Sequence, residues 1–260
     1  MKNIFSAIWA ESLKVIKSKI FWITFFFFIF LPFMMGLMFF VSKNPELSAK
    51  LGMIGDKSAL FGESDWPAYF RLLNLSIAML GLIGFGFVTS WVFGREYSDR
   101  TVKDLLVLPI PRSSIVLAKF IIITTWCLIL SAVTLSVGLI MGGVFQLSGW
   151  TSEIAFHSSR IFLVTTLLTI FLNTPVAFFA SHGRGYLSPM GFVIGTLIIA
   201  QFIGLMGLGP YFPWAIPALF LGVTGAENEH LSIFSYVILF FTSGVGFYLT
   251  LFWWNRVDQT

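Results

Sequence analysis

Six apolar runs, each long enough to cross a lipid bilayer as a helix, constrain the fold of this chain most strongly. They cover residues 20–41, 72–93, 115–145, 161–180, 187–208 and 231–254. A helix of about 20 residues spans the roughly 30 Å hydrocarbon core and satisfies its own backbone hydrogen bonds there. A mean hydropathy of +0.89 with 11% charged residues exceeds what a water-soluble domain can bury. The sequence therefore predicts an all-α polytopic membrane protein, with residues 1–260 forming one domain of six transmembrane helices.

An amphipathic helix is predicted over residues 1–19, before the first apolar run. Phe5 and Trp9 recur at helical spacing on one side, and Glu11 and Lys14 fall on the other. We expect this helix to lie in the membrane interface, with its basic residues near anionic lipid headgroups. Two roles stay open, a simple topology anchor or a mechanical part that moves the first span.

Basic residues predict the orientation of the chain, because they bias flanking loops toward the cytoplasm. Placing both termini inside leaves most of the 16 basic residues on the cytoplasmic side. The basic pI near 9.3 then reports membrane topology. It predicts no nucleic-acid partner.

Two segments between spans are predicted to lie on the outer side. Residues 42–70 form a long polar loop that either shapes an exit, binds a ligand or is simply solvated. Residues 209–230 begin with an apolar stretch in which Pro210, Pro213 and Pro217 break the helical hydrogen-bond ladder. We expect a re-entrant hairpin followed by an outer loop.

Few polar groups fall within the spans. The candidates are Asn74, Thr89, Thr125, Thr134, Asn173 and Gln201. They either line a pathway or pack helices together through interhelical hydrogen bonds, and the second role is favoured. Lys119 is expected to reach the cytoplasmic interface from the end of its span. In the fourth span, Pro175 should kink the helix, with Thr174 or a neighbouring helix compensating for the lost bond.

Motifs for catalysis and metal binding were sought and not found in the sequence. It contains no phosphate-binding P-loop, no H-E-x-x-H and no G-x-S-x-G motif. The cluster of Glu227, Glu229 and His230 fits a solvated turn better than a metal site. We therefore expect no catalytic residue, no metal site and no cofactor in this chain.

A charged island at residues 95–114 separates the second and third runs. Residues 99–107 can form a short helix with Ser98 as its N-cap, and Thr101, followed by Asp104, is a second capping option. Val102, Leu105 and Leu106 then share one face, with charged residues around it, as in a protein-docking surface. The alternative is an interfacial turn that only fixes topology.

The order of residues in this island carries a family resemblance. The run from Arg95 to Leu106, followed by Pro109, Arg112 and Lys119, resembles the first cytoplasmic loop of permease subunits of type-2 ABC exporters. Many members have glycine before the threonine, where this chain has Arg100. The resemblance extends loosely over the whole chain and is closest to permeases linked to bacitracin and lantibiotic resistance.

The resemblance implies a transporter subunit in a bacterial cytoplasmic membrane. Two permease subunits, identical or homologous, would form the pathway for an antimicrobial peptide, drug or other amphipathic substrate. Two separate ABC ATPase subunits would bind ATP and Mg and dock on the island. The coupling residues implied are Glu96, Asp99, Arg100, Thr101, Val102, Lys103, Asp104, Leu105, Leu106, Pro109 and Arg112. A membrane scaffold or sensor subunit that binds a cytoplasmic regulator without transport remains the alternative.

Overall fold

The protein is described by a computed structural model over residues 2–44, 46, 48, 50, 64–102, 110–222 and 231–256, with side chains from residue 4. The long helices are α1 (Lys2–Ile16), α2 (Lys19–Lys43), α5 (Trp66–Ser98), α7 (Arg112–Val144), α8 (Ser152–Phe171), α9 (Thr174–His182), α10 (Leu187–Leu205) and α12 (Ile233–Arg256). Within the described ranges, six helical segments are long and apolar enough to cross a membrane, with α8 and α9 together forming the fourth. The predicted number and order of spans are confirmed.

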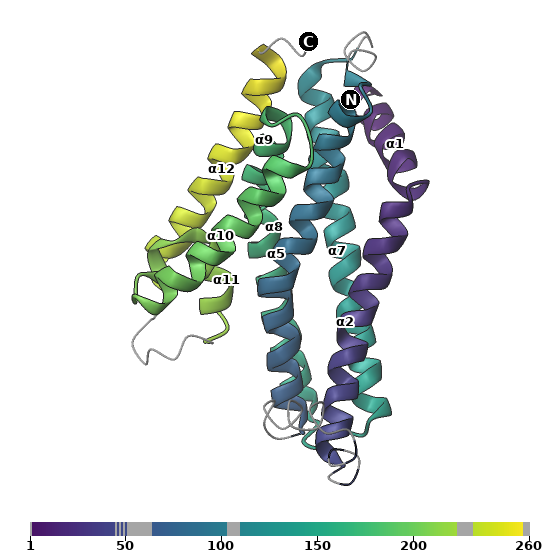
Figure 1. Ribbon diagram of the computed structural model, residues 1–260, viewed down its shortest axis with the longest axis vertical. Helices are drawn as coiled ribbons and strands as arrows, with labels where there is room; N and C mark the ends of the chain where they lie inside the picture. Colours follow the sequence, from purple (N-terminus) through teal and green to yellow (C-terminus); the bar gives the residue numbers. More distant parts are fainter. Residues whose placement is uncertain are drawn as a thin grey trace.

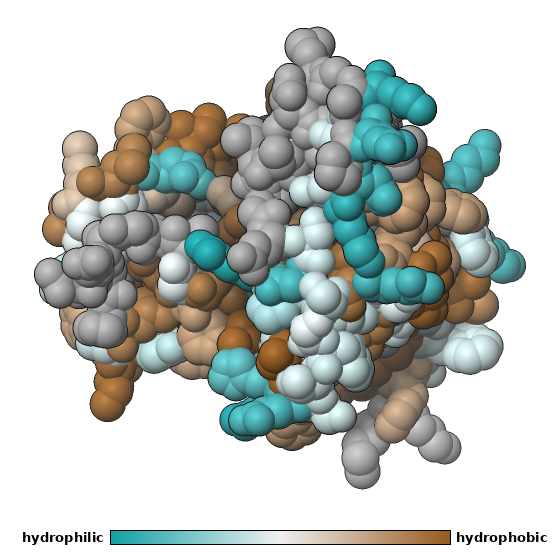
Figure 2. Space-filling model, turned by 90° about the horizontal axis from the view of Figure 1, so that it is seen from below, coloured by the Kyte–Doolittle hydropathy of each residue, from teal (hydrophilic) through white to brown (hydrophobic). Residues whose placement is uncertain are grey.

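The spans run side by side, and α5 lies among α2, α7, α8, α9 and α10 (Figure 1). Because successive spans reverse direction, the start of α1 and the end of α12 lie at the same end of the molecule, which we call the α1 end (Figure 1). At the opposite end, hydrophilic residues lie across the end face between hydrophobic surfaces (Figure 2). This distribution fits a bundle whose sides face lipid.

Close packing of α2 on α5 depends on one aromatic pair. The rings of Phe28 and Phe85 stack with centroids 5.7 Å apart, and both side chains are fully buried. A Cβ atom at Gly84 would lie 2.7 Å from the Phe28 ring. Glycine is therefore required there for the two helices to approach.

Threonine hydroxyls replace the backbone hydrogen bonds that two prolines remove. Pro32 leaves the carbonyl of Phe28 without its helical donor, and the Thr134 hydroxyl of α7 is shared between that oxygen at 3.1 Å and the Leu130 carbonyl at 3.0 Å. Pro175 similarly frees the carbonyl of Phe171, and the Thr174 hydroxyl is shared between that oxygen at 2.9 Å and the Ser243 carbonyl of α12 at 2.7 Å. The predicted break in the fourth span is confirmed, since α8 ends before Pro175 and α9 begins beside it.

The second span is longer than its apolar run. Asp65 caps the start of α5 by accepting a hydrogen bond from the Ala68 backbone N–H at 2.9 Å, and the helix continues through Ser98. Its 33 residues measure about 50 Å at 1.5 Å per residue. The expectation that Ser98 is an N-cap is wrong, because residues 96–98 form the last turn of α5.

After α10 the proline-rich segment forms three short helical pieces, η1 (Gly209–Tyr211), η2 (Pro213–Ala215) and α11 (Ile216–Leu219). Ile216 is fully buried in a cluster with Leu82, which lies midway along α5, and with Leu239 of α12. The outer part of this prediction, residues 223–230, lies outside the described residues. So do residues 45, 47, 49 and 51–63 of the predicted outer loop.

Candidate functional site

A buried cluster of charges joins three helices at the α1 end. Glu11 and Lys14 come from α1, Glu96 from the last turn of α5, and Lys119 from the third turn of α7. Lys119 is 0% exposed, Glu96 2% and Glu11 3%. Two carboxylates and two ammonium groups balance one another, so the cluster carries no net charge.

Each member of this cluster has more than one partner. The Lys119 ammonium donates to Glu11 Oε2 at 3.1 Å, to Glu96 Oε1 at 3.0 Å and to the Val92 carbonyl at 3.0 Å. These contacts use all three of its N–H donors. Lys14 donates to Glu11 Oε1 at 2.7 Å and to Glu96 Oε1 at 3.0 Å.

The cluster shifts the pKa values of its two α1 members. Burial alone would raise the pKa of Glu11, but Lys119 and Lys14 favour the carboxylate and together hold that pKa below its usual value. Burial would likewise lower the pKa of Lys14, yet Glu11 and Glu96 raise it. Both groups therefore stay charged at neutral pH, and their attraction to Lys119 of α7 and Glu96 of α5 holds α1 against the bundle.

The turn that ends α5 is hydrogen-bonded to this cluster. The Thr101 backbone N–H donates to the Glu96 carbonyl at 2.9 Å, and that of Arg100 donates to the Tyr97 carbonyl at 3.2 Å. This pair of backbone hydrogen bonds forms a Schellman cap. In such a cap the residue after the helix takes a positive φ, and Arg100 has a φ of 58°. Thr101 Oγ1 also donates to Glu96 Oε2 at 2.8 Å. The first residues of the predicted coupling loop are thus bonded directly to the buried cluster.

The far side of the loop is attached to a different helix. Arg112 Nη1 donates to the Trp254 carbonyl of α12 at 3.2 Å, and Trp254 Nε1 donates to Ser181 Oγ of α9 at 2.9 Å. Residues 103–109, which lie between the two attachments, include the predicted coupling residues Lys103, Asp104, Leu105, Leu106 and Pro109. They lie outside the described residues.

The remaining predicted coupling residues fall into three groups. Thr101 and Arg112 are half-buried, and Asp99 and Arg100 are exposed at the α1 end. Glu96 and Val102 are instead buried inside this chain, with Val102 4% exposed. Contact of any of these residues with a partner stays a prediction, and Glu96 would transmit movement through the cluster rather than present its carboxylate on the surface.

The polar candidates within the spans also differ in their exposure. Thr125 and Gln201 are exposed, whereas Thr89, Asn74 and Asn173 are buried. Thr89 and Thr125 donate to carbonyls of their own helices. Of the threonine and asparagine candidates, Thr134 makes a side-chain bond between helices, to α2.

Some buried polar atoms of α5, of α8 and of the turn between α8 and α9 have no partner among the described residues. They are Asn74 Oδ1, Thr165 Oγ1, Thr166 Oγ1 and Asn173 Oδ1. The amide nitrogen of Asn173, which lies in that turn, donates to the Thr169 carbonyl of α8. Unsatisfied groups at such depth are costly, so their occurrence on two facing helices requires an explanation.

Sequence reasoning missed the buried cluster. The expectation that Lys119 reaches the interface is wrong, because its ammonium is bonded to two carboxylates and enclosed by protein. Lys14 is bonded to Glu11 and Glu96 rather than turned to lipid headgroups as expected, whereas Phe5, 70% exposed, faces outward. A signal was present, since a lysine between Ala118 and Phe120 in an apolar run requires an acidic partner.

Comparison with known proteins assigns the chain to a class. A family model described as ABC-2 family transporter protein matches residues 7–203, a stretch that includes all four charges of the cluster. The chain belongs to this family and is a multi-pass membrane subunit of the ABC-2 permease type, not itself an enzyme. It is similar to the bacitracin transport permease protein BCRB of Bacillus licheniformis. The two are 25% identical over 191 residues, which cover 73% of this chain and 91% of the relative.

Proposed function

We propose that this chain is one membrane half of an ABC exporter and is driven by ATPase subunits that dock on the coupling loop, residues 95–114. The observation that supports this most is the anchoring of the loop. Its start is bonded through Glu96 to α1 and α7, and its end is bonded through Arg112 to α12. A push on residues 103–109 would therefore act on four helices.

Movement would follow from ATP binding to the partner. The chain has two arrangements of its helices, and the ATPase favours one of them because it contacts the two differently. The charge cluster makes α1, the end of α5 and the start of α7 move as one unit. Two ATPase subunits supply the ATP and Mg chemistry, and a second permease subunit, identical or homologous, completes the pathway.

The pathway itself would use the facing sides of α5 and α8. Unpartnered buried atoms of α8 and of the turn after it, including Thr165 Oγ1 and Asn173 Oδ1, would bond to water or substrate in the other arrangement. The short helices after α10 would be a re-entrant hairpin, because Ile216 packs at the depth of Leu82.

Orientation and cargo are part of the same proposal. The α1 end, which carries the loop, faces the cytoplasm of a bacterial cell because most basic residues lie there. Similarity to a bacitracin transport permease supports an antimicrobial peptide, drug or other amphipathic molecule as the substrate.

Co-purification tests the proposal. The tagged chain is isolated from its native membrane in mild detergent, and the bound proteins and ATP hydrolysis are compared with those of Leu105→Asp. We expect an ATPase subunit to accompany the wild type and to be lost from the variant. Leu187→Asp is the control, since Leu187 is an exposed leucine at the start of α10, outside the coupling loop. Equal recovery from all three proteins would refute docking at this loop. If no preparation yields an ATPase, the scaffold or sensor function gains support instead.

A further inference from the structure

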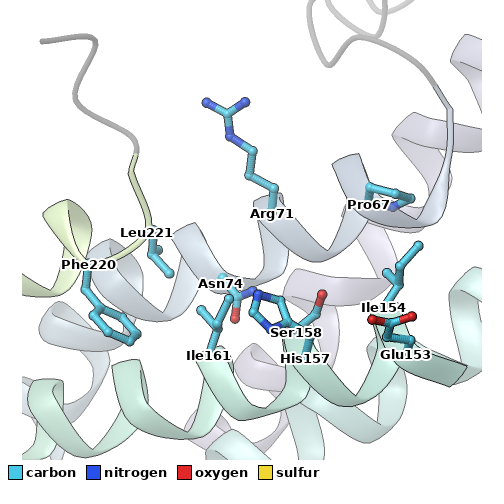
Figure 3. Close-up of a pocket in the computed structure, with 10 residues that line it drawn as sticks. All are labelled: Pro67, Arg71, Asn74, Glu153, Ile154, His157, Ser158, Ile161, Phe220 and Leu221. Carbon is cyan, nitrogen blue, oxygen red and sulfur yellow. The ribbon is translucent and has the colours of Figure 1, made fainter. Parts of the chain in front are cut away.

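A second site lies at the end opposite the charge cluster. A pocket of about 530 Å³ opens between α5, α8 and the residues that follow α11. Its polar lining includes Arg71 and Asn74 of α5 with Glu153 and His157 of α8. Figure 3 shows Arg71 extending outward from α5, while Asn74 points toward the side of α8 that carries His157 and Ser158.

Asn74 indicates that this pocket takes a ligand. The residue is 5% exposed, and its Oδ1 atom has no hydrogen-bond partner among the described residues. A buried carbonyl oxygen that faces a cavity accepts a hydrogen bond from whatever fills the cavity. The occupant should therefore present an N–H or O–H donor to Asn74.

Two opposite charges border the same pocket without neutralising each other. In the part of the chain that the structure describes, no ion pair joins Arg71 or Glu153 to any other residue. Arg71 can bind an anionic group of a ligand, and Glu153 can bind a cationic one. A ligand that carries one charge of each sign matches this arrangement.

Apolar residues form the rest of the wall. Ile161 lies one turn deeper along α8 than His157, and Phe220 and Leu221 follow α11. A ligand bound by its polar end at Arg71 and Glu153 would therefore place a hydrocarbon tail against these apolar residues.

The pocket lies at the level of lipid headgroups. Trp150, which is half exposed, precedes α8 and packs against Trp66 at the start of α5. Exposed tryptophans mark the boundary between hydrocarbon and water in membrane proteins. Arg71 and Glu153 lie within two turns of these residues along their helices.

We propose that this pocket binds the headgroup of a zwitterionic phospholipid that carries a phosphate and a primary ammonium group. Arg71 binds the phosphate, while Glu153 and Asn74 Oδ1 accept hydrogen bonds from the ammonium. The acyl chains lie along Ile161 and Phe220. This assignment goes beyond the proposed export function and does not depend on an ATPase partner.

Native mass spectrometry of the purified full chain tests this assignment. The protein is loaded with phosphatidylethanolamine or phosphatidylglycerol of identical acyl chains, which differ in the ammonium group. We expect the wild type to retain phosphatidylethanolamine more strongly than phosphatidylglycerol, by a factor on the order of ten. One charge-assisted hydrogen bond to the ammonium accounts for a preference of this size. Glu153→Gln and Asn74→Leu should each reduce this preference, and Arg71→Gln should weaken retention of both lipids.

Controls separate lipid binding from loss of structure and from other ligands. Arg160→Gln removes an exposed cation of α8 outside the pocket and should change neither lipid. Thermal unfolding of each variant shows whether it is folded. If Asn74→Leu does not fold, Glu153→Gln alone tests the preference for phosphatidylethanolamine. Equal retention of the two lipids by the wild type would overturn the proposal. So would displacement of the lipid by an equal concentration of free phosphoethanolamine, or by a cationic amphipathic peptide whose binding the same variants abolish.

Discussion

At the scale of single residues, Lys119 is the side chain on which the charge cluster most depends. Lys119→Met would leave Glu11 and Glu96 facing each other in a buried site, with Lys14 as their remaining cation. Removing one partner from a buried ionic network costs about 3–5 kcal/mol. We expect a loss of this size in the free energy of unfolding, measured by denaturing-detergent titration.

Lys17→Met provides the matched comparison for this variant. Lys17 is exposed just after α1, so its loss should change the free energy of unfolding by about 0.5 kcal/mol or less. Equal stability of the two variants would show that the buried network contributes nothing to the fold.

The pH dependence of α1 attachment follows from Glu11 and Lys14. The Glu11 pKa lies below its ordinary 4.5, so its contribution is present above that pH and is lost as pH falls through the lowered pKa. The Lys14 pKa lies above its ordinary 10.5, so its contribution is present below that pH and is lost as pH rises through the raised pKa. We expect α1 to stay attached from about pH 4.5 to 10.5 and to loosen outside this window.

A spin label reports this attachment. Cys127 is the single cysteine, so a label at Leu13→Cys in a Cys127→Ser background is unique. Its mobility should rise at acidic pH below the window. Constant mobility down to pH values that protonate every carboxylate would contradict a role of Glu11 in holding α1.

Arg100 tests the turn that ends α5. A non-glycine residue at positive φ costs about 1 kcal/mol, and Arg100 has φ 58°. Arg100→Gly should therefore raise the free energy of unfolding by up to about 1 kcal/mol, whereas the β-branched Arg100→Val should lower it. Thermal unfolding of both variants measures the difference, and a glycine variant less stable than the valine variant would contradict the Schellman cap.

At the scale of helices, the proline in α2 makes Thr134 of α7 a structural contact. Thr134→Val keeps the shape of the side chain but leaves the Phe28 carbonyl without a donor. Such bonds between membrane helices contribute about 1 kcal/mol. Thr125→Val, which removes an exposed hydroxyl bonded to its own helix, should cost far less. If the two variants unfold alike, the Thr134 bond does not stabilise the α2–α7 contact.

The helices show what local sequence can and cannot predict. Apolar length predicts each span because a bilayer requires that length, and Pro175 predicts the break after α8 because a proline removes a specific bond. The C-terminal end of α5 lies beyond the predicted one. A carboxylate such as Glu96 is typical of a loop, and it is accommodated in the helix because Lys119 and Lys14 neutralise its charge. Positions 11, 96 and 119 are distant in sequence, so their meeting depends on how α1, α5 and α7 pack.

At the scale of the whole molecule, the two ends have different tasks in this account. The α1 end joins the coupling loop to α1, α5 and α7 through buried charges, and to α12 through Arg112 and Trp254. The opposite end carries the pocket that includes Arg71 and Asn74. The family resemblance of residues 95–112 predicts the importance of the first end, and the coupling role of these residues stays a prediction. The pocket could not be predicted, because its lining comes from three separate segments.

Movement at the α1 end on ATP binding would show that the coupling loop transmits the action of the ATPase to the membrane helices. Spin labels at Lys17→Cys and Asn255→Cys, in a Cys127→Ser background, report the distance between the end of α1 and the end of α12 in the complex with its ATPase. We predict that ATP shifts this distance distribution in the wild-type loop and that Leu105→Asp abolishes the shift. An identical ATP-dependent shift in Leu105→Asp, or no shift in either protein, would contradict transmission through the coupling loop and the charge cluster.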